Sequence, residues 1–202
     1  MSRGKQLRDV IFGRRSIRRY EPRPVPRPLI LELLTAATWA PSAHNRQPWR
    51  FAVIESTGQK AHLAAQMGER LQRDLTADGL PVAVIQQDVA RSYQRITSAP
   101  VVILLSATMA DMDAYPDKRR AGHEMTMAVQ SVAMAGQNIL LAAHDAGLGA
   151  CWMCAPLFCP DVVRDALSLP ADWLPQGMLT VGYPAQARSK TRRPLGDVTI
   201  WR

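Results

Sequence analysis

The longest apolar pattern in the chain covers residues 125–143, which contain no proline and a single glycine, Gly136. Its apolar residues are spread nearly all round the predicted helix, a pattern typical of a helix buried on most sides. Polar residues, among them Gln130, Gln137 and Asn138, interrupt the pattern too often for a membrane span. A chain of this size has little else to cover such a helix, so the pattern favours a partner subunit packed against it.

A glycine and a short apolar run follow this helix. Gly147 is expected to end it in the left-handed conformation, and residues 148–154 then predict a buried strand. The helix also carries four small residues that we expect to admit a neighbouring backbone at close range: Ala128, Ala133, Ala135 and Gly136.

Shorter patterns on either side predict the rest of the secondary structure. Helices are expected at residues 6–12, 29–39, 59–74, 82–96 and 160–167, the second of them opened by Pro28 in its first turn. Strands are expected at residues 50–55, 100–106 and 177–183, with a weak strand pattern at 198–201. In this order the elements predict an α+β fold, an α/β sandwich, formed by one domain over residues 1–202.

Positive charge is in excess, with 25 Lys and Arg against 17 Asp and Glu and a net charge of +8. A nucleic-acid-binding face usually shows a basic helix, a recognisable reading motif or interleaved aromatic residues, and the sequence has none of these. The arginines instead form short groups at residues 14–19, 119–120 and 188–193. Two explanations remain: an Arg-rich surface, or a small anionic ligand held between two of these groups.

The first residues are polar and charged and precede no apolar stretch, so no signal peptide is predicted and the cytoplasm is the expected location. Three cysteines, Cys151, Cys154 and Cys159, are an odd number and argue against a disulfide framework. A zinc or dithiol pair is disfavoured, because a strand places Cys151 and Cys154 on opposite faces and no second ligand pair accompanies them. No metal site is expected.

The first arginine group has the composition of a phosphate clamp. Arg14 and Arg15 each offer a planar fork of donors, and Ser16 adds a short hydroxyl beside them. The same residues on a solvated surface are the alternative explanation.

A second polar stretch lies between two prolines, Pro41 and Pro48. Ser42, Asn45 and Gln47 present donors and acceptors there from a stiffened backbone, which suits a heterocyclic ligand with a polar edge. An ordinary surface turn is the alternative. No GxGxxG motif follows the first strand, which disfavours a dinucleotide-binding Rossmann domain.

Four separated motifs occur in order along nearly the whole chain, from Arg14 to Pro194. They are residues 14–18; residues 41–49; Gln137-Asn138 with residues 147–152; and residues 182–184 with residues 190–194. Together they resemble the FMN-dependent nitroreductase family, and most closely the members related to the domain fused to deazaflavin-coenzyme glutamate ligases. Each motif alone is weak, whereas the four in this order are specific.

The resemblance implies a central, mainly antiparallel sheet flanked by helices, a long central helix and an interlocked homodimer with FMN at the subunit interface. It assigns the FMN phosphate to the N-terminal and C-terminal basic motifs: Arg14, Arg15, Ser16, Arg18, Lys190 and Arg192. The loop of the other subunit would reach the flavin through Pro41, Ser42, Ala43, Asn45 and Gln47. The strand after the long helix would run past one face of the flavin, so that Trp152, Met153 and Cys154 lie beside the ring. Ser131 would touch the pyrimidine edge of the flavin.

The implied reaction is a hydride or two-electron transfer from NAD(P)H through FMN to a small electron-poor acceptor, such as a nitroaromatic compound or a quinone. The flavin supplies the redox chemistry, so no catalytic side chain is nominated, and His44 and Arg46 could shape the acceptor site. A flavin-binding accessory or biosynthetic protein without turnover is the first alternative, and a basic nucleic-acid-binding protein is the second. The expected partners are a second copy of the chain and a small-molecule acceptor, with no nucleic acid and no membrane.

Overall fold

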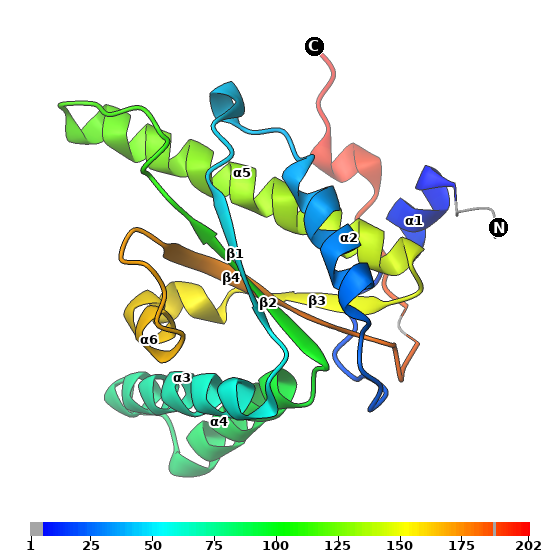
Figure 1. Cartoon of the computed structure of the whole chain (residues 1–202), viewed down its shortest axis with the longest axis vertical. Coiled ribbons are helices and arrows are strands. Elements are labelled where there is room, and N and C mark those ends of the chain that lie inside the picture. The colour runs from blue at the N-terminus through cyan, green and yellow to red at the C-terminus, as the bar shows by residue number, and fades with distance from the viewer. Residues whose placement is uncertain (1–5, 188) are drawn as a thin grey trace.

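Four antiparallel strands form the centre of the protein (Figure 1). The computed structural model describes residues 6–187 and 189–202, and its strands are β1 (Trp49–Ile54), β2 (Val101–Ala107), β3 (Gly149–Met153) and β4 (Leu174–Gly182). Their order in the sheet is β1-β2-β4-β3, and each neighbouring pair is antiparallel. β2 and β4 therefore lie inside the sheet, while β1 and β3 are its edges.

Helices cover both faces of the sheet (Figure 1). They are α1 (Leu7–Gly13), α2 (Arg27–Thr38), α3 (Thr57–Ala77), α4 (Val82–Thr97), α5 (Lys118–Asp145) and α6 (Pro160–Ala166), with short 3₁₀ helices η1 (Ala43–Asn45), η2 (Ala155–Phe158) and η3 (Leu195–Val198). α2 and α5 pack on one face, and α3, α4 and α6 lie on the other. The predicted α+β fold and the predicted order of helices and strands are confirmed.

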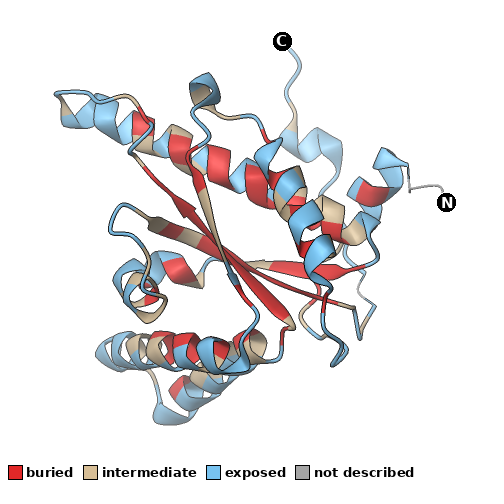
Figure 2. Cartoon of the chain, viewed as in Figure 1, coloured by how far each residue is buried: buried red, intermediate tan, exposed pale blue. Residues whose placement is uncertain are grey.

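The alternation of side chains along β2 divides the core into two layers. Val101, Ile103 and Leu105 pack with residues of α2 and α5, whereas Val102 and Leu104 pack with residues of α3 and α6. All five side chains are buried, and β2 is red along its length in Figure 2. This is the arrangement expected for a continuous apolar run in a strand that is covered on both faces.

The long predicted helix is α5, and it starts at Lys118, earlier than the predicted residue 125. The Asp117 side chain accepts a hydrogen bond from the backbone N–H of Arg120 and so caps the first turn. At the other end Gly147 adopts a φ of 77°, which confirms the predicted left-handed stop. Neither α5 nor any other helix in the described part of the chain is long and apolar enough to cross a membrane.

α5 is buried along one face and open along the other (Figure 2). Ala133 and Met134 lie on the open face, where Met134 is 38 % exposed. Gly136 faces the core, and a Cβ added there would overlap the Trp152 ring. Gly136 therefore makes room for an indole rather than for a neighbouring backbone, which corrects the prediction for this residue.

The weak strand pattern at residues 198–201 is wrong as a prediction. The structure forms η3 at Leu195–Val198 and pairs no strand with the residues that follow. Apolar alternation alone makes no strand, because the backbone hydrogen-bonding groups also need a neighbouring edge. Four large apolar side chains of this segment are 64–88 % exposed: Leu195, Val198, Ile200 and Trp201.

Candidate functional site

The segment after α1 runs along the open edge of β3. Ser16 forms a parallel bridge with Ala150, and the Ile17 N–H donates to the Ala150 carbonyl oxygen at 3.0 Å. Gly149 permits this close approach, because a Cβ there would lie 2.8 Å from the Ile17 side chain. The segment is thereby fixed against the sheet.

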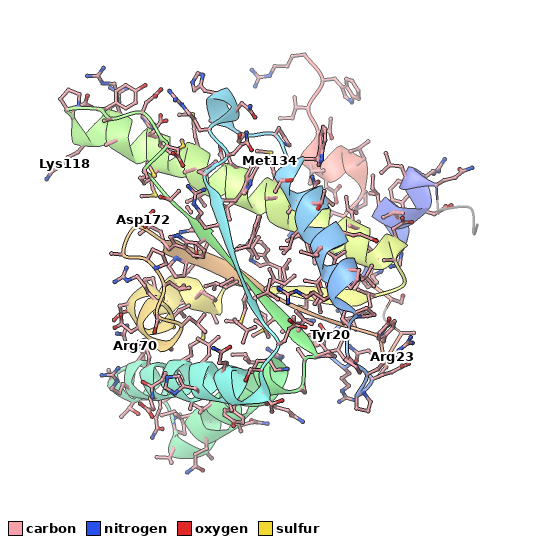
Figure 3. All side chains as sticks on the ribbon, in the orientation of Figure 1. Tyr20, Arg23, Arg70, Lys118, Met134 and Asp172 are labelled. Carbon is pink, nitrogen blue, oxygen red and sulfur yellow. The ribbon has the colours of Figure 1, made fainter. Side chains whose placement is uncertain are left out.

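Tyr20 anchors the far end of the same segment (Figure 3). Its hydroxyl oxygen lies 2.6 Å from the Ile17 carbonyl oxygen, 2.9 Å from the Thr180 carbonyl oxygen and 2.7 Å from Thr180 Oγ1. Burial raises the pKa of Tyr20 above its ordinary value, so the hydroxyl stays protonated and can donate. The arginines of this segment are therefore presented from a firm support.

Six residues from two distant parts of the chain line one pocket of about 190 Å³ beside this segment. They are the six that the resemblance assigns to the FMN phosphate: Arg14, Arg15, Ser16, Arg18, Lys190 and Arg192. The structure brings these side chains together although most of the chain separates them, and we call this the cationic pocket. Arg188, from the same basic stretch of the sequence, lies outside the described residues.

Among residues 6–187 and 189–202, no carboxylate forms an ion pair with the cations of this pocket. Neither its arginines nor Lys190 take part in an ion pair with any described residue. Burial, and next the charges of Arg192 and Arg15, lower the pKa of Arg14 from its ordinary value. Positive groups that repel one another in this way gain most from an anion with several acceptor oxygens. The residues present therefore fit a phosphate group.

Arg15 differs from its neighbours in the cationic pocket. Its Nη1 donates to the carbonyl oxygens of Phe12 at 2.6 Å and of Arg14 at 2.8 Å, where α1 ends. These bonds satisfy carbonyl groups that the end of a helix leaves without partners. Part of the Arg15 guanidinium is thus hydrogen-bonded to the backbone at the end of α1. The sequence pattern did not indicate this structural role.

Arg18 also lines a second pocket, of about 300 Å³, and so connects the two. The end of β3 contributes Trp152, Met153 and Cys154 to this second pocket. These are the three residues that the resemblance assigns to the side of the flavin ring, and we call this the ring pocket. Through Arg18, the cationic pocket adjoins a pocket that reaches the end of β3.

One wall of the ring pocket comes from α4, which the sequence pattern indicates only as a surface helix. Four residues form this wall: Asp88, Arg91, Ser92 and Arg95. They are three or four positions apart and hence share one helix face, and this spacing of polar residues is the signal that could have identified them. Asp88 forms an ion pair with Arg91, whereas Arg95 has no carboxylate partner in the part of the chain that the structure describes.

The two cysteines near this pocket differ in exposure. Cys151 is buried and Cys154 is exposed, and no group of three or more potential metal ligands occurs within residues 6–187 and 189–202. Burial raises the pKa of Cys151, and the charges of Arg18 and Arg95 oppose that rise. The positive potential of both arginines therefore reaches β3.

The Trp152 indole is half-buried and packed against two glycines. It lies against Gly136 and Gly177, and a Cβ at Gly177 would come within 2.5 Å of the ring; its Nε1 donates to Cys154 Sγ at 3.1 Å. The Ala150 carbonyl faces the outer edge of β3, and alternate residues of a strand direct their peptide groups to the same side. The peptide N–H of Trp152 is therefore directed to the open edge, where a ligand can use it.

The polar loop from Pro41 to Gln47, which we call the left-handed loop, has an unusual backbone. His44, Asn45 and Gln47 have φ values of 49°, 53° and 50°, and each non-glycine residue in this region costs about 1–3 kcal/mol. Inside the loop, the Gln47 N–H donates to Ser42 Oγ at 3.1 Å. A loop that keeps this conformation needs support from outside.

Ser131 of α5 provides one such support, because its Oγ accepts from the Ala43 N–H at 3.4 Å and donates to the Met127 carbonyl oxygen at 2.8 Å. His144, near the C-terminal end of α5, lies against Gly13 and the segment that bears the cationic pocket. Ser131 and His144 are more than three helical turns apart, roughly 20 Å along the axis. Within one chain the left-handed loop and the cationic pocket do not meet. The implied role of the loop at the site of another subunit stays a prediction.

The model of the Nitroreductase family matches residues 11–183 of this chain. The chain belongs to the nitroreductase family. As a nitroreductase-family protein it is a flavin oxidoreductase in general terms, and the predicted fold, enzyme class and cofactors agree with that assignment. The matched residues include the segment after α1, the left-handed loop and the ring pocket. Lys190 and Arg192 lie just beyond them.

Several relatives resemble the chain over almost its whole length. The NADH dehydrogenase of Thermus thermophilus is 30 % identical over 220 residues, which cover 96 % of this chain and 95 % of that protein. A nitroreductase-type protein of Desulfovibrio desulfuricans, whose crystal structure contains FMN, is 28 % identical with a TM-score of 0.77 and covers 99 % of this chain and 98 % of its own. A BluB-like flavoprotein of Clostridium difficile reaches a TM-score of 0.80 at 22 % identity, over 98 % of this chain and 100 % of its own. This last likeness shows the fold alone.

Proposed function

We propose that the protein is an FMN-dependent oxidoreductase that passes a hydride or two electrons from NADH or NADPH to a small electron-poor acceptor. One observation carries the proposal: an unneutralised cationic pocket adjoins, through Arg18, the pocket at the end of β3. A phosphate fits the first pocket by charge, and a ring attached to it would extend toward the second.

The cationic pocket would hold the FMN phosphate. Arg14, Lys190 and Arg192 can donate charge-assisted hydrogen bonds to its oxygens, and the Ser16 hydroxyl can add a neutral one. Burial, and next the charges of Arg192 and Arg15, lower the pKa of Arg14, and a bound phosphate would offset the repulsion among these cations. Binding is therefore favoured by new bonds and by the removal of an existing electrostatic cost.

The ring pocket would orient the flavin and tune its affinity for electrons. Bound FMN supplies the redox chemistry itself. Arg18 and Arg95 bring positive charge to this pocket, which favours the uptake of negative charge there. The Trp152 peptide N–H, directed to the open edge of β3, can donate to the ring. No side chain is required as a nucleophile, and none is nominated.

We further propose that the protein works as a homodimer. The left-handed loop and the cationic pocket lie apart within one chain, so a site containing both takes them from two chains. Large apolar side chains are also left in the open, among them Trp39 at 83 % and Trp201 at 88 % exposure. A second copy that covers such surface stabilises the assembly. The cytoplasmic location stays a prediction.

The proposal is tested by the colour of the purified protein. We expect a yellow dimer by light scattering, whose visible flavin absorbance bleaches when NADH or NADPH is added without oxygen and returns with a quinone or nitroaromatic acceptor. A yellow protein that neither nicotinamide reduces would support the accessory flavoprotein instead. A colourless protein that shifts labelled DNA in a salt-dependent way would support the nucleic-acid alternative.

A further inference from the structure

An acidic segment after β2, residues 108–117, contacts the end of the left-handed loop and the residues that follow it. Asp111 forms an ion pair with Arg50, with Oδ2 and Nη2 2.7 Å apart, and Asp113 forms one with Arg46. The backbone N–H of Thr108 also donates to the Pro48 carbonyl oxygen at 2.9 Å. Three contacts thus join the acidic segment to residues 46–50.

The acidic segment is itself held in place by buried groups. Glu124 of α5 is 1 % exposed, and its Oε1 accepts from the Asp113 N–H at 3.1 Å. At the other end, the Thr108 hydroxyl donates to Asp172 Oδ2 at 2.7 Å and accepts from the Ala110 N–H at 3.2 Å, and Asp172 lies in the loop that precedes β4 (Figure 3). The acidic segment is therefore fixed to α5 at one end and to the loop before β4 at the other, so it can restrict the movement of residues 46–50.

The left-handed loop needs that rigidity. Its residues His44, Asn45 and Gln47 occupy a backbone region that non-glycine residues leave readily. The bonds inside the loop are local: the Asn45 and Arg46 N–H groups donate to the Ser42 and Ala43 carbonyl oxygens at 3.0 and 2.9 Å, and the Gln47 side chain reaches Asn45 Oδ1 only at 3.4 Å. Ser131 supports one side of the loop through Ala43, and the acidic segment is the support on the side of Arg46.

We propose that the acidic segment, anchored by Glu124, is a positioning element that holds the left-handed loop in the conformation that receives FMN. The inference rests on the proposed function, because it assumes that the loop borders the flavin. Glu124 and Asp113 then act as positioning residues that touch no ligand. Arg46 acts with them as the part of the chain that they hold.

A charge swap at Arg46 and Asp113 tests the proposal directly. We expect Arg46→Asp and Asp113→Arg each to weaken FMN binding about 3- to 10-fold, and the double variant to return to within about 2-fold of the wild type. The dissociation constant is measured from the flavin fluorescence released when the holoprotein is diluted. The loss in the single variants should shrink at high salt, because exposed ion pairs are screened.

A second ion pair of similar geometry serves as the control. Arg70 and Asp161 join α3 to α6 at 2.6 Å on the other face of the sheet, so Asp161→Arg should leave FMN binding within about 2-fold of the wild type. Single variants at Arg46 and Asp113 that bind FMN like the wild type, or a double variant that regains nothing, would overturn the inference while leaving the proposed function intact. A wild-type protein that binds no FMN would overturn both.

Glu124 provides an independent test of the anchor. Glu124→Gln keeps an oxygen that accepts from the Asp113 N–H, so FMN affinity should stay within about 3-fold, whereas Glu124→Leu removes the acceptor and should cost about 10-fold. The visible circular dichroism of the bound flavin should change in the leucine variant only. Equal affinities in the two variants would contradict the anchoring role, and if the leucine variant fails to fold the charge swap decides.

Discussion

The two ends of α5 use arginine in opposite ways. Near its C-terminal end, Arg14 and Arg192 line a pocket without a carboxylate partner in the described residues. Near its N-terminal end, Arg46 and Arg50 are each paired with an aspartate. The net charge of +8 does not distinguish the two unpaired arginines from the two paired ones. The pairing separates arginines that are available to an anionic ligand from arginines that join one segment to another.

The largest effect should come from the unpaired arginines. Arg14→Ala with Arg192→Ala should weaken FMN binding at least 100-fold, because each removes charge-assisted bonds of about 1.5–3 kcal/mol. The chain should remain folded, since the change also removes mutual repulsion between the two cations. Flavin fluorescence and far-ultraviolet circular dichroism measure both results. Arg19→Ala is the matched control, because Arg19 belongs to the same group of arginines, residues 14–19, but lines neither pocket. A double variant that keeps its flavin would show that the clamp is misassigned.

A substitution in the middle of α5 should show the next largest effect, on the stability of the protein. Gly136→Ala should destabilise the protein by about 1–3 kcal/mol, because the added methyl group overlaps the Trp152 ring. Gly122→Ala in the same helix meets nothing within 4 Å and should stabilise it by about 0.4–1 kcal/mol. Urea unfolding of the two variants measures the contrast. Equal changes in the free energy of unfolding would mean that the contact between Gly136 and the Trp152 ring does not limit the size of residue 136.

Arg18 should show a smaller effect on two properties at once, because it lines both pockets. Arg18→Ala should weaken FMN binding about 10-fold and lower the flavin midpoint potential by roughly 10–30 mV, as expected for the loss of one partly screened charge near the ring. Equilibration with a reference dye reports the potential. Arg18→Lys keeps the charge and should recover most of the potential. An unchanged potential in the alanine variant would place the ring elsewhere.

Arg15 should show the smallest effect. Because its Nη1 is bound to the carbonyl oxygens of Phe12 and Arg14, Arg15→Ala should change FMN affinity by no more than about 3-fold. The amides at the end of α1 should instead exchange faster with deuterium. If affinity falls as far as it does for the Arg14 and Arg192 pair, Arg15 belongs with the unpaired cations.

The sequence predicts best what local pattern and spacing control. The order of elements followed from apolar periodicity, and the six residues of the cationic pocket followed from two basic motifs that resemble a known family. The left-handed stop at Gly147 was predictable because glycine adopts that conformation at little cost. In each case the information lies in a few consecutive residues.

The features that were missed depend on contacts between distant residues. α4 resembles an ordinary amphipathic helix, and only the fold directs Asp88 and Arg95 at the end of β3. Glu124 looks like one more polar interruption of a long helix until Asp113 is placed against it. The strand expected at residues 198–201 failed for the same reason, because pairing needs an available edge and not only alternation.

The cationic pocket is lined by residues from both ends of the described chain, Arg14 and Arg192, which are synthesised far apart in time. A ribosome exposes the first of these residues long before the second, so no nascent chain can complete the pocket until Arg192 has left the exit tunnel. An anion that needs both arginines can therefore bind at this pocket only after Arg192 has emerged, when every strand of the sheet has already been synthesised.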